Sequence, residues 1–337
     1  ALPDLDGRAP DAQDGRSRLA AGSLLGDSGP GTGEGERPVT EQTLCEQLGA
    51  TVQPSSKIVP QILEELTDDK EQRLLMAASP PATVQELAEK AGLDPAAVEK
   101  MVDPLFTKGL LFKSKKKDAI RYYRFRNLMQ LHDATGVTIG APQKVLDLWK
   151  EHTKTEWIDW VEQLEGAIKR PVLRVIPVNQ SIEQTSQVMA FEDLKELVDG
   201  ATTLATTKCS CRAIDGACGL PIDVCIQVDR AAEYAIERGT GRELTKPETI
   251  DLLKQCAEEG LVAVSENKQG LGMVICNCCG DCCINWTSLK QGSRKFAAPS
   301  RYRSFRYRQT AQSSSRGVFH QPFCTWSYPQ RFLVACT

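Results

Sequence analysis

The chain has 337 residues, of which 41% are apolar and 25% are charged, an ordinary composition for a globular protein, and its formal net charge is −3. This near-neutral charge excludes a chain built as a whole to bind nucleic acid or an anionic membrane surface. No segment approaches the roughly 20 uncharged apolar residues of a membrane-spanning helix, and the acidic N-terminus lacks the plan of a signal peptide. We therefore expect a cytoplasmic protein with no membrane partner.

The first segment, residues 1–45, is rich in Gly, Pro, Ser and Asp, and no aromatic residue precedes Phe106. Such a composition offers little apolar surface to offset the entropy lost on ordering. We predict a disordered arm.

Residues 55–130 change to short amphipathic segments. Ile58, Ile62 and Leu66 recur at helical spacing, a capping box begins at Thr83, and Asp94 followed by proline begins a longer helix. Residues 110–112 and 120–125 then form two strands around a lysine-rich turn. Helices followed by a basic hairpin predict a winged helix-turn-helix.

The winged-helix module has two interpretations, protein docking and DNA binding. The helix after Asp94 offers only Lys100 and Lys108 beside Glu99 and Asp103, whereas a DNA-reading helix presents several basic or amide side chains. Phosphate contacts from the hairpin would not read sequence, so we favour docking and expect weak DNA binding only. The possible nucleic-acid contacts are Lys113, Lys115, Lys116, Lys117, Arg121 and Arg124.

Residues 131–170 are predicted to be a helical connector. Trp157, Trp160 and Leu164 share one helical face and indicate a packing stripe. His132 and His152 are isolated in the sequence, and we interpret both as structural or surface residues.

Residues 171–305 alternate between strand and helix signals. The predicted elements are strands over 172–176 and 201–207, helices over 191–198 and 225–239, a capping-box helix over 245–260, and a hairpin over 261–264 and 271–275. Asp223 is predicted to cap the second helix, with Cys225 in its first turn. Both groups of cysteines are then expected just beyond strand ends, where loops can converge on one site.

Cysteine is the anomaly of the composition, with 13 residues, ten of them between Cys209 and Cys283. Crowding of this kind without a secretory signal argues against a disulfide framework and for thiolate ligation of a metal or cluster. The first group is Cys209, Cys211, Cys218 and Cys225, and the second is Cys276, Cys278, Cys279, Cys282 and Cys283.

No histidine lies between Cys209 and Cys283, which excludes zinc sites with histidine ligands, Rieske clusters and Cys/His nucleophilic pairs within that segment. Iron-sulfur clusters, zinc held by four thiolates, and structural or redox thiols remain. Zinc ribbons present two C-x2-C knuckles, and only Cys279-x2-Cys282 has that form. We therefore favour one or two [4Fe-4S] clusters.

The cysteine motifs and the segments around them also resemble those of a known family. Cys209-Ser-Cys-Arg212, the helix 231–239, the stretch 241–245 and Ile275-Cys-Asn-Cys-Cys-Gly-Asp-Cys-Cys283 resemble a family of prokaryotic 4Fe-4S ferredoxin-type proteins with an N-terminal winged-helix segment. The resemblance covers about residues 55–305. It implies an α+β protein, in which a winged helix-turn-helix precedes a mixed α/β cysteine-rich domain that binds iron-sulfur clusters.

The leading functional hypothesis is one-electron transfer with a partner redox enzyme. Arg212 and Arg242 are candidate cations around the cluster, where they would stabilise its more negative reduced state. Three alternatives stay open: a redox-sensing transcription regulator that uses the winged helix, a structural zinc protein with four-thiolate sites, and an enzyme that uses the cluster as a Lewis acid.

The tail, residues 306–337, differs in composition from the rest of the chain because it is basic. After Asp281 the chain carries nine basic residues and no acidic one. Relatives of the kind described above usually continue into a C-x2-C-x2-C-x3-C-P ferredoxin module, whereas the later cysteines here are Cys324 and Cys336. We expect a disordered tail that is dispensable for cluster binding, either a basic arm or a shifted reading frame.

Overall fold

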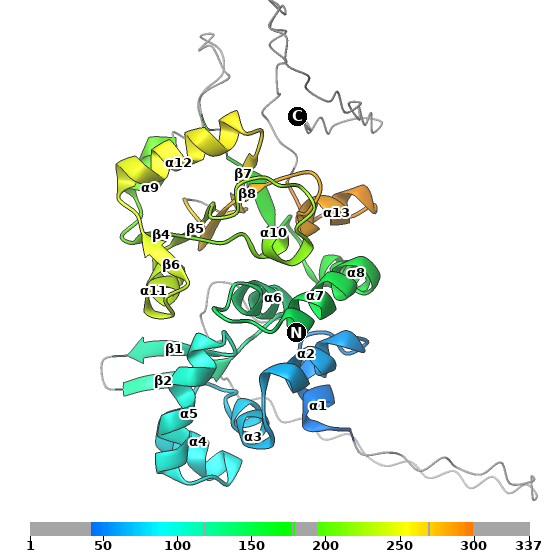
Figure 1. Cartoon of the computed structure of the whole chain (residues 1–337), viewed down its shortest axis with the longest axis vertical. Helices are drawn as coiled ribbons and strands as arrows, with labels where there is room; N and C mark the ends of the chain where they lie inside the picture. Colours follow the sequence, from blue (N-terminus) through cyan, green and yellow to red (C-terminus); the bar gives the residue numbers. More distant parts are fainter. Residues whose placement is uncertain (1–41, 117–118, 177, 179–193, 269, 299–337) are drawn as a thin grey trace, which may run out of the picture. The chain divides into compact units, whose positions relative to one another are not determined.

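The structure is a computed structural model that describes residues 42–116, 119–176, 178, 194–268 and 270–298 (Figure 1). It is mixed helix and sheet, consistent with the α+β class. The arm predicted over 1–45 falls outside the described residues except at its end, where Leu44 and Cys45 already belong to helix α1 (Leu44–Ala50). The predicted tail over 306–337 lies outside them entirely.

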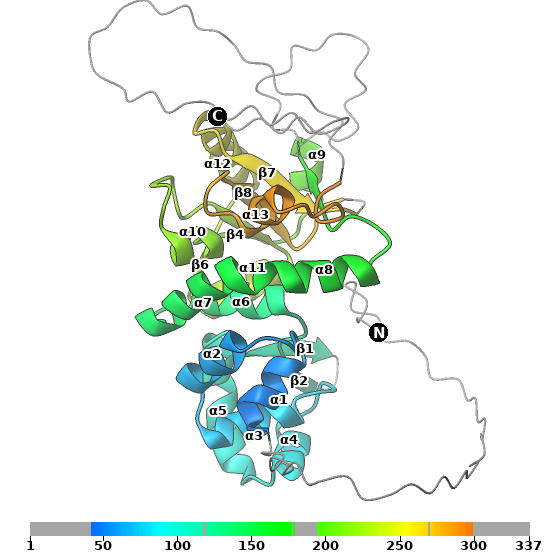
Figure 2. The ribbon, with the colours of Figure 1, turned by 90° about the vertical axis from the view of Figure 1, so that its right-hand side faces the viewer.

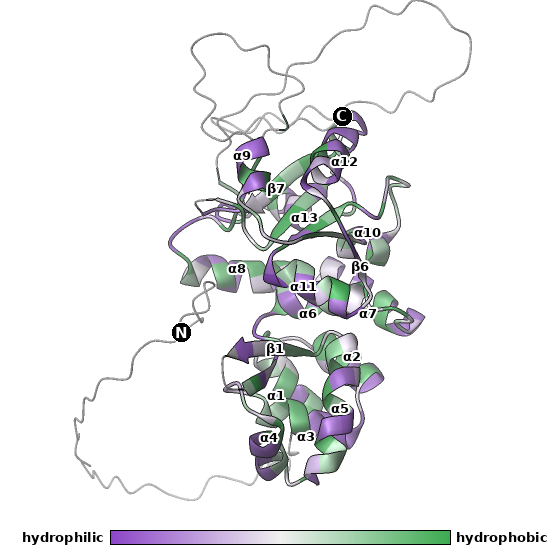
Figure 3. Cartoon of the chain, turned by 90° about the vertical axis from the view of Figure 1, so that its left-hand side faces the viewer, coloured by the Kyte–Doolittle hydropathy of each residue, from purple (hydrophilic) through white to green (hydrophobic). Residues whose placement is uncertain are grey.

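The N-terminal part contains four further helices and a two-stranded antiparallel hairpin. They are α2 (Ile58–Leu66), α3 (Asp69–Ala77), α4 (Val84–Ala91), α5 (Pro95–Thr107), β1 (Leu111–Lys116) and β2 (Ala119–Arg124). The capping box at Thr83 and the Asp94 cap, which accepts the Ala97 backbone N–H, are confirmed. Ala82 forms an antiparallel bridge with Tyr122, so the segment before α4 is attached to the hairpin. Purple and green residues are mixed around α4 and α5 in Figure 3, as in amphipathic helices.

The connector consists of α6 (Leu128–Gly136), α7 (Gln143–Thr155) and α8 (Trp157–Ala167). Trp149 and Trp157 are fully buried, and the Trp157 and Trp160 rings pack 4.9 Å apart, which confirms the packing stripe. His132 and His152 are buried among these indoles. None of the helices in the described part of the chain combines the length and apolar content that a membrane span needs.

The C-terminal part is built on a six-stranded antiparallel sheet with strand order β3-β7-β8-β5-β4-β6. Its strands are β3 (Leu173–Val175), β4 (Leu204–Thr207), β5 (Cys225–Val228), β6 (Gly241–Glu243), β7 (Val262–Glu266) and β8 (Val274–Cys278). The helices are α9 (Leu194–Asp199), α10 (Ser210–Asp215), α11 (Arg230–Glu237), α12 (Lys246–Glu258) and α13 (Ile284–Lys290).

The prediction that Cys225 lies in the first turn of a helix is wrong. Cys225 begins strand β5, and α11 starts only at Arg230. Burial alternates along the segment, with Ile226 and Val228 buried. The segment lies between β4 and β8, and hydrogen bonding to both neighbouring strands stabilises its extended conformation. The chain enters α11 through Asp229, a residue at φ 50°. Cys276 and Cys278 likewise lie within β8 rather than beyond its end.

Alternation along the strands separates the apolar core from the thiols. Ile226, Ala263 and Ile275 pack with residues of α9 and α12 on one face of the sheet. Val264, Cys276 and Cys278 belong to the other face, which adjoins the core that continues into the N-terminal helices. Figure 1 shows α9 and α12 on one side of the sheet and α6 on the other.

Helix α11 connects the sheet to the hairpin. It packs against β4, β5 and β6, and its Tyr234 hydroxyl donates to the Lys113 carbonyl of β1. Arg238, the residue just after α11, donates to the Phe106 and Leu111 carbonyls at 2.7 and 3.0 Å. Its guanidinium lies over the Phe106 and Phe112 rings. The elements concerned can be followed in Figure 2.

Candidate metal centre

The fold brings nine thiols from the two sequence groups into one region and sorts them into two spatial sets. The first set, the trio, is Cys218, Cys279 and Cys282. The second, the six-thiol group, is Cys209, Cys211, Cys225, Cys276, Cys278 and Cys283. Each set draws on both sequence groups, so neither group forms a site alone.

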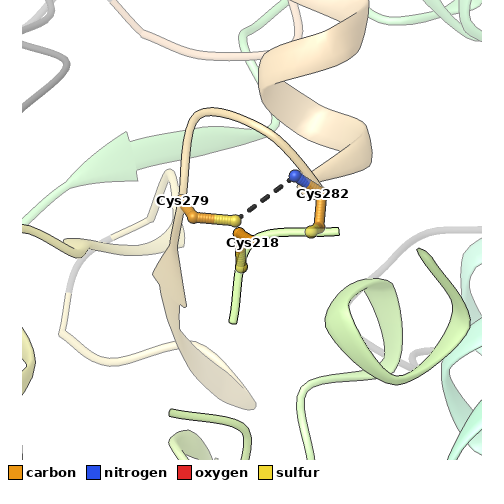
Figure 4. A group of neighbouring side chains, drawn as sticks. All are labelled: Cys218, Cys279 and Cys282. Carbon is orange, nitrogen blue, oxygen red and sulfur yellow. Dashed lines mark hydrogen bonds between the residues drawn. The ribbon is translucent and has the colours of Figure 1, made fainter. Parts of the chain in front are cut away.

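The trio could hold a metal ion, because its three Sγ atoms all lie within 4.8 Å of one another. In Figure 4 the side chains converge, Cys279 and Cys282 from the loop between β8 and α13 and Cys218 from the segment after α10. The backbone N–H of Cys282 donates to Sγ of Cys279 at 3.3 Å. Cys279 and Cys282 are 4% and 5% exposed, and Cys218 is half-buried.

The six-thiol group is assembled on the sheet. The antiparallel register that pairs Ile226 with Ile275 places Cys225 opposite Cys276, and Cys278 shares a face with Cys276. Cys283 precedes α13, Cys209 precedes α10, and Cys211 lies in the first turn of α10. The thiols interact in series in the order Cys225, Cys276, Cys278, Cys283, Cys211, Cys209.

Shared protons make two of these thiols acidic. The neighbouring Cys225 and Cys278 thiols lower the pKa of Cys276 to about 6. Cys211 and Cys278, helped by backbone N–H groups at the start of α13, hold the pKa of Cys283 well below its usual range. The same interactions, together with burial, raise the pKa of Cys211, Cys225 and Cys278. The shifts at Cys276 and Cys283 favour the thiolate, which is the metal-binding form.

The two sets have different apolar surroundings. The trio packs with Val224, Leu261 and Cys256. Cys278 and Cys283 belong to the large core shared with the connector helices. The adjacent pairs Cys278-Cys279 and Cys282-Cys283 each contribute one thiol to each set, as expected where successive side chains of an extended chain point in opposite directions. The loop between β8 and α13 thus serves both sets.

Arg212 is a buried cation in this region, with 3% of its surface exposed. Its guanidinium donates to the Pro221 carbonyl and, at 3.1 Å, to the Asn277 carbonyl, while its Nε has no partner. Burial lowers the pKa of Arg212, but the Cys209, Cys279 and Cys218 sulfurs outweigh it, so the pKa is raised.

No carboxylate of the described residues pairs with the Arg212 guanidinium. A buried charge without a counter-ion is costly, so this cation fits a region whose thiols are ionised around a metal. The donor set suits a thiolate-ligated metal or cluster: nine sulfurs, no imidazole, and a buried cation beside them.

Arg242 lies elsewhere than expected for a cluster cation. It stands on β6, its guanidinium is bound to the Glu248 carboxylate at 3.2 Å, and its side chain is 65% exposed. Its other hydrogen bond goes to the Glu243 carbonyl. The structure thus brings Arg212, but not Arg242, to the thiols.

Most of the predicted hairpin cations are already engaged within the chain. Lys113 is paired with Asp103 at 3.0 Å and Glu237 at 2.6 Å, and Lys115 lies 3.6 Å from Glu237. Arg121 binds Glu86 at 2.7 Å, and Arg124, whose pKa is lowered by burial, donates to the Leu75 and Met76 carbonyls. Lys116 ends β1, and Lys117 lies outside the described residues.

Sequence reasoning missed three polar residues of the region. Gln227 donates its side-chain amide to Sγ of Cys225 at 3.2 Å, and its position two residues along the strand could have indicated this. Asp133 of α6 accepts a hydrogen bond from Ser210 at 2.7 Å, and Asp215 of α10 interacts with Cys282. No local signal marks Asp133 or Asp215, because only the packing of α6 and α10 brings them to the thiols.

Comparison with protein-family models, with curated proteins and with solved structures gave no match. The chemistry of the site therefore has to be argued from its residues.

Proposed function

We propose that this protein binds at least one [4Fe-4S] cluster through thiolates of the six-thiol group and exchanges single electrons with a partner redox enzyme. The observation that carries the proposal is the convergence of six thiols without a histidine, with the buried Arg212 beside Cys209 and without a carboxylate partner among the described residues. Four-cysteine ligation is the norm for such clusters, and the group supplies six candidates. The resemblance of the cysteine phrases to 4Fe-4S ferredoxin-type proteins supports the same assignment.

A bound cluster would supply reversible one-electron chemistry, and the residues of this chain would tune it. Gln227 donates a hydrogen bond to the Cys225 sulfur, which stabilises negative charge there. Arg212 adds a positive charge in a poorly solvated place. The apolar neighbours of Cys278 and Cys283 limit access of water.

We assign the N-terminal part, as a winged-helix module, to docking rather than to DNA reading. The ion pairs of Lys113, Lys115 and Arg121 neutralise the charges that would bind phosphate. A module whose basic groups are satisfied internally is better suited to support the cysteine-rich part or to meet a protein.

The proposal is tested by anaerobic reconstitution with iron and sulfide, followed by metal analysis and electron paramagnetic resonance of the dithionite-reduced protein. We expect a brown protein with broad absorbance at about 400 nm and a spectrum of a one-electron-reduced cluster. Cys276→Ala should lower the bound iron strongly.

The matched control is Cys45→Ala, because Cys45 is also buried but belongs to helix α1. Burial, aided by the charge of Glu64, raises the pKa of Cys45 to about 11, which makes it a poor ligand. Colourless protein that holds zinc alone would overturn the cluster assignment and favour the structural zinc alternative.

A further inference from the structure

The trio has three sulfurs, one fewer than a four-coordinate ion requires. The Asp215 carboxylate interacts with the Cys282 thiol and offers a fourth donor for the set. It lies outside the 4.8 Å group, so its side chain must rotate to join the three sulfurs. Its side chain is 23% exposed and its ion pair with Lys150 is 3.6 Å long, so the restraint on that rotation is weak.

The four residues form two pairs with the same spacing. Cys279-x2-Cys282 is one knuckle, and Asp215-x2-Cys218 has the same spacing with a carboxylate in the first position. Two such knuckles facing each other are the plan of a tetrahedral zinc site. Gly216 at φ 69° ends α10 and turns the chain toward Cys218, and Lys290 holds the Gly280 carbonyl of the other loop at 2.5 Å.

We propose that Cys218, Cys279, Cys282 and Asp215 bind one zinc ion as a second metal centre, separate from the six-thiol group. Three thiolates and one carboxylate are a donor set that zinc accepts in tetrahedral geometry. The inference does not rest on the proposed cluster, since it uses none of the same sulfurs. The thiols lose their protons to solvent when the ion binds.

The charges nearby fit this site. Three thiolates and one carboxylate around a divalent ion leave two negative charges. The Arg212 guanidinium interacts with Cys279, and the Lys150 ammonium donates to the Asp215 carbonyl at 2.7 Å. These two cations balance the excess, which three protonated thiols without a metal ion would not need.

The trio and the six-thiol group also pack against different apolar side chains. Val224 and Leu261 pack around the buried sulfurs of the trio, whereas Cys278 and Cys283 lie in another apolar cluster. An ion at the trio is therefore enclosed by its own apolar shell, which fixes its geometry.

The test is zinc analysis and zinc X-ray absorption spectroscopy on the full chain after anaerobic reconstitution, because this signal is not affected by iron. We expect one zinc per chain with three sulfurs at about 2.3 Å and one oxygen at about 2.0 Å.

Asp215→Cys should retain zinc and change the shell to four sulfurs. Asp215→Ala should weaken zinc binding at least about tenfold in competition with a chelator. The matched control Asp281→Ala, in the loop between Cys279 and Cys282, should leave it unchanged.

Two variants separate this inference from the proposed cluster. Cys279→Ala should remove zinc and leave the iron content unchanged, whereas Cys276→Ala should do the reverse. Loss of iron in Cys279→Ala, absence of zinc from the reconstituted protein, or a four-sulfur zinc shell in the unaltered chain would overturn the inference. A protein that holds zinc at the trio and binds no iron would contradict only the proposed cluster.

Discussion

At the scale of single residues, the unusual feature is the burial of ionisable side chains. Arg212 is buried without a carboxylate partner, and His132 and His152 are buried with one ring nitrogen each left unpartnered. Such groups cost stability unless something in the functional state compensates them. For Arg212 the compensation is the neighbouring sulfurs, whereas for His152 it is the neutral form of the ring, because burial lowers its pKa.

Arg212→Gln should lower the midpoint potential of a reconstituted cluster. Removing the buried positive charge destabilises the more negative reduced state, and a change of about 60 mV corresponds to tenfold in a one-electron equilibrium. Arg212→Lys, which keeps the charge, should shift the potential less, and the exposed Arg242→Gln should not shift it. A redox titration followed by electron paramagnetic resonance measures all three. An unchanged potential in Arg212→Gln at normal iron content would show that the cation does not act on the cluster.

His152 should make stability depend on pH. Burial, with an electrostatic contribution from the neighbouring His132 ring, lowers the pKa of His152 to about 3, although the Glu156 carboxylate lies 3.8 Å from Nε2. The folded pKa lies below the unfolded value of about 6.5, so this stabilisation is complete above about pH 6.5 and is lost as the pH falls toward 3. The loss between pH 7 and pH 5 is about 2 kcal/mol.

Urea unfolding of metal-free protein at several pH values measures that loss. The difference between the original chain and His152→Gln cancels the other titrating groups, and the variant should lose about 2 kcal/mol less over this pH interval. Equal pH slopes for the two proteins would mean that His152 is protonated in the folded state.

At the scale of elements, α11 joins two parts of the chain that the sequence treats as separate modules. Tyr234 and Arg238 meet the rings of Phe106 and Phe112, and Glu237 pairs with Lys113. The same hairpin cations that suggested DNA contact are thereby used inside the molecule. Helix α11 and strand β1 therefore join these two parts through contacts within the chain.

Arg238→Ala should destabilise the fold by about 2–3 kcal/mol, through lost cation–π contacts and two carbonyls left without their donor. Arg230→Ala, at the exposed start of the same helix, is the matched control and should change stability little. Denaturant unfolding compares the two variants. The contact between α11 and the hairpin would carry little energy if both variants unfolded at the same concentration.

At the scale of the whole molecule, the nine thiols of the candidate metal centre lie between Cys209 and Cys283. Among the described residues, the last buried apolar side chain is that of Phe296, whose backbone carbonyl accepts the Leu173 N–H at 3.0 Å.

A chain ending at Phe305 should therefore keep its full iron and zinc content. A chain ending at Gln291 should lose stability by several kcal/mol, because it lacks the fully buried Phe296 and the Lys295 backbone that pairs with Glu165. Metal analysis and thermal unfolding of the two truncations test the difference. Loss of metal on truncation at Phe305 would mean that the tail, including Cys324 or Cys336, takes part in the site.

The sequence by itself determined the helices whose signals are local, and it singled out nine cysteines as candidate metal ligands. The capping boxes at Thr83 and Thr245 formed as expected, because a cap needs only residues within one helical turn. The absence of histidine from the segment likewise needs no fold to be read.

Only the tertiary structure decided which cysteines meet. Cys225 was expected in a helix, but pairing with β4 and β8 made it a strand residue opposite Cys276. The regrouping of thiols into three and six, and the approach of Asp215 to Cys282, depend on residues about 65 positions apart in the chain. Strand register and helix packing set those distances, and both are fixed by burial over the whole sheet rather than by neighbours in the sequence.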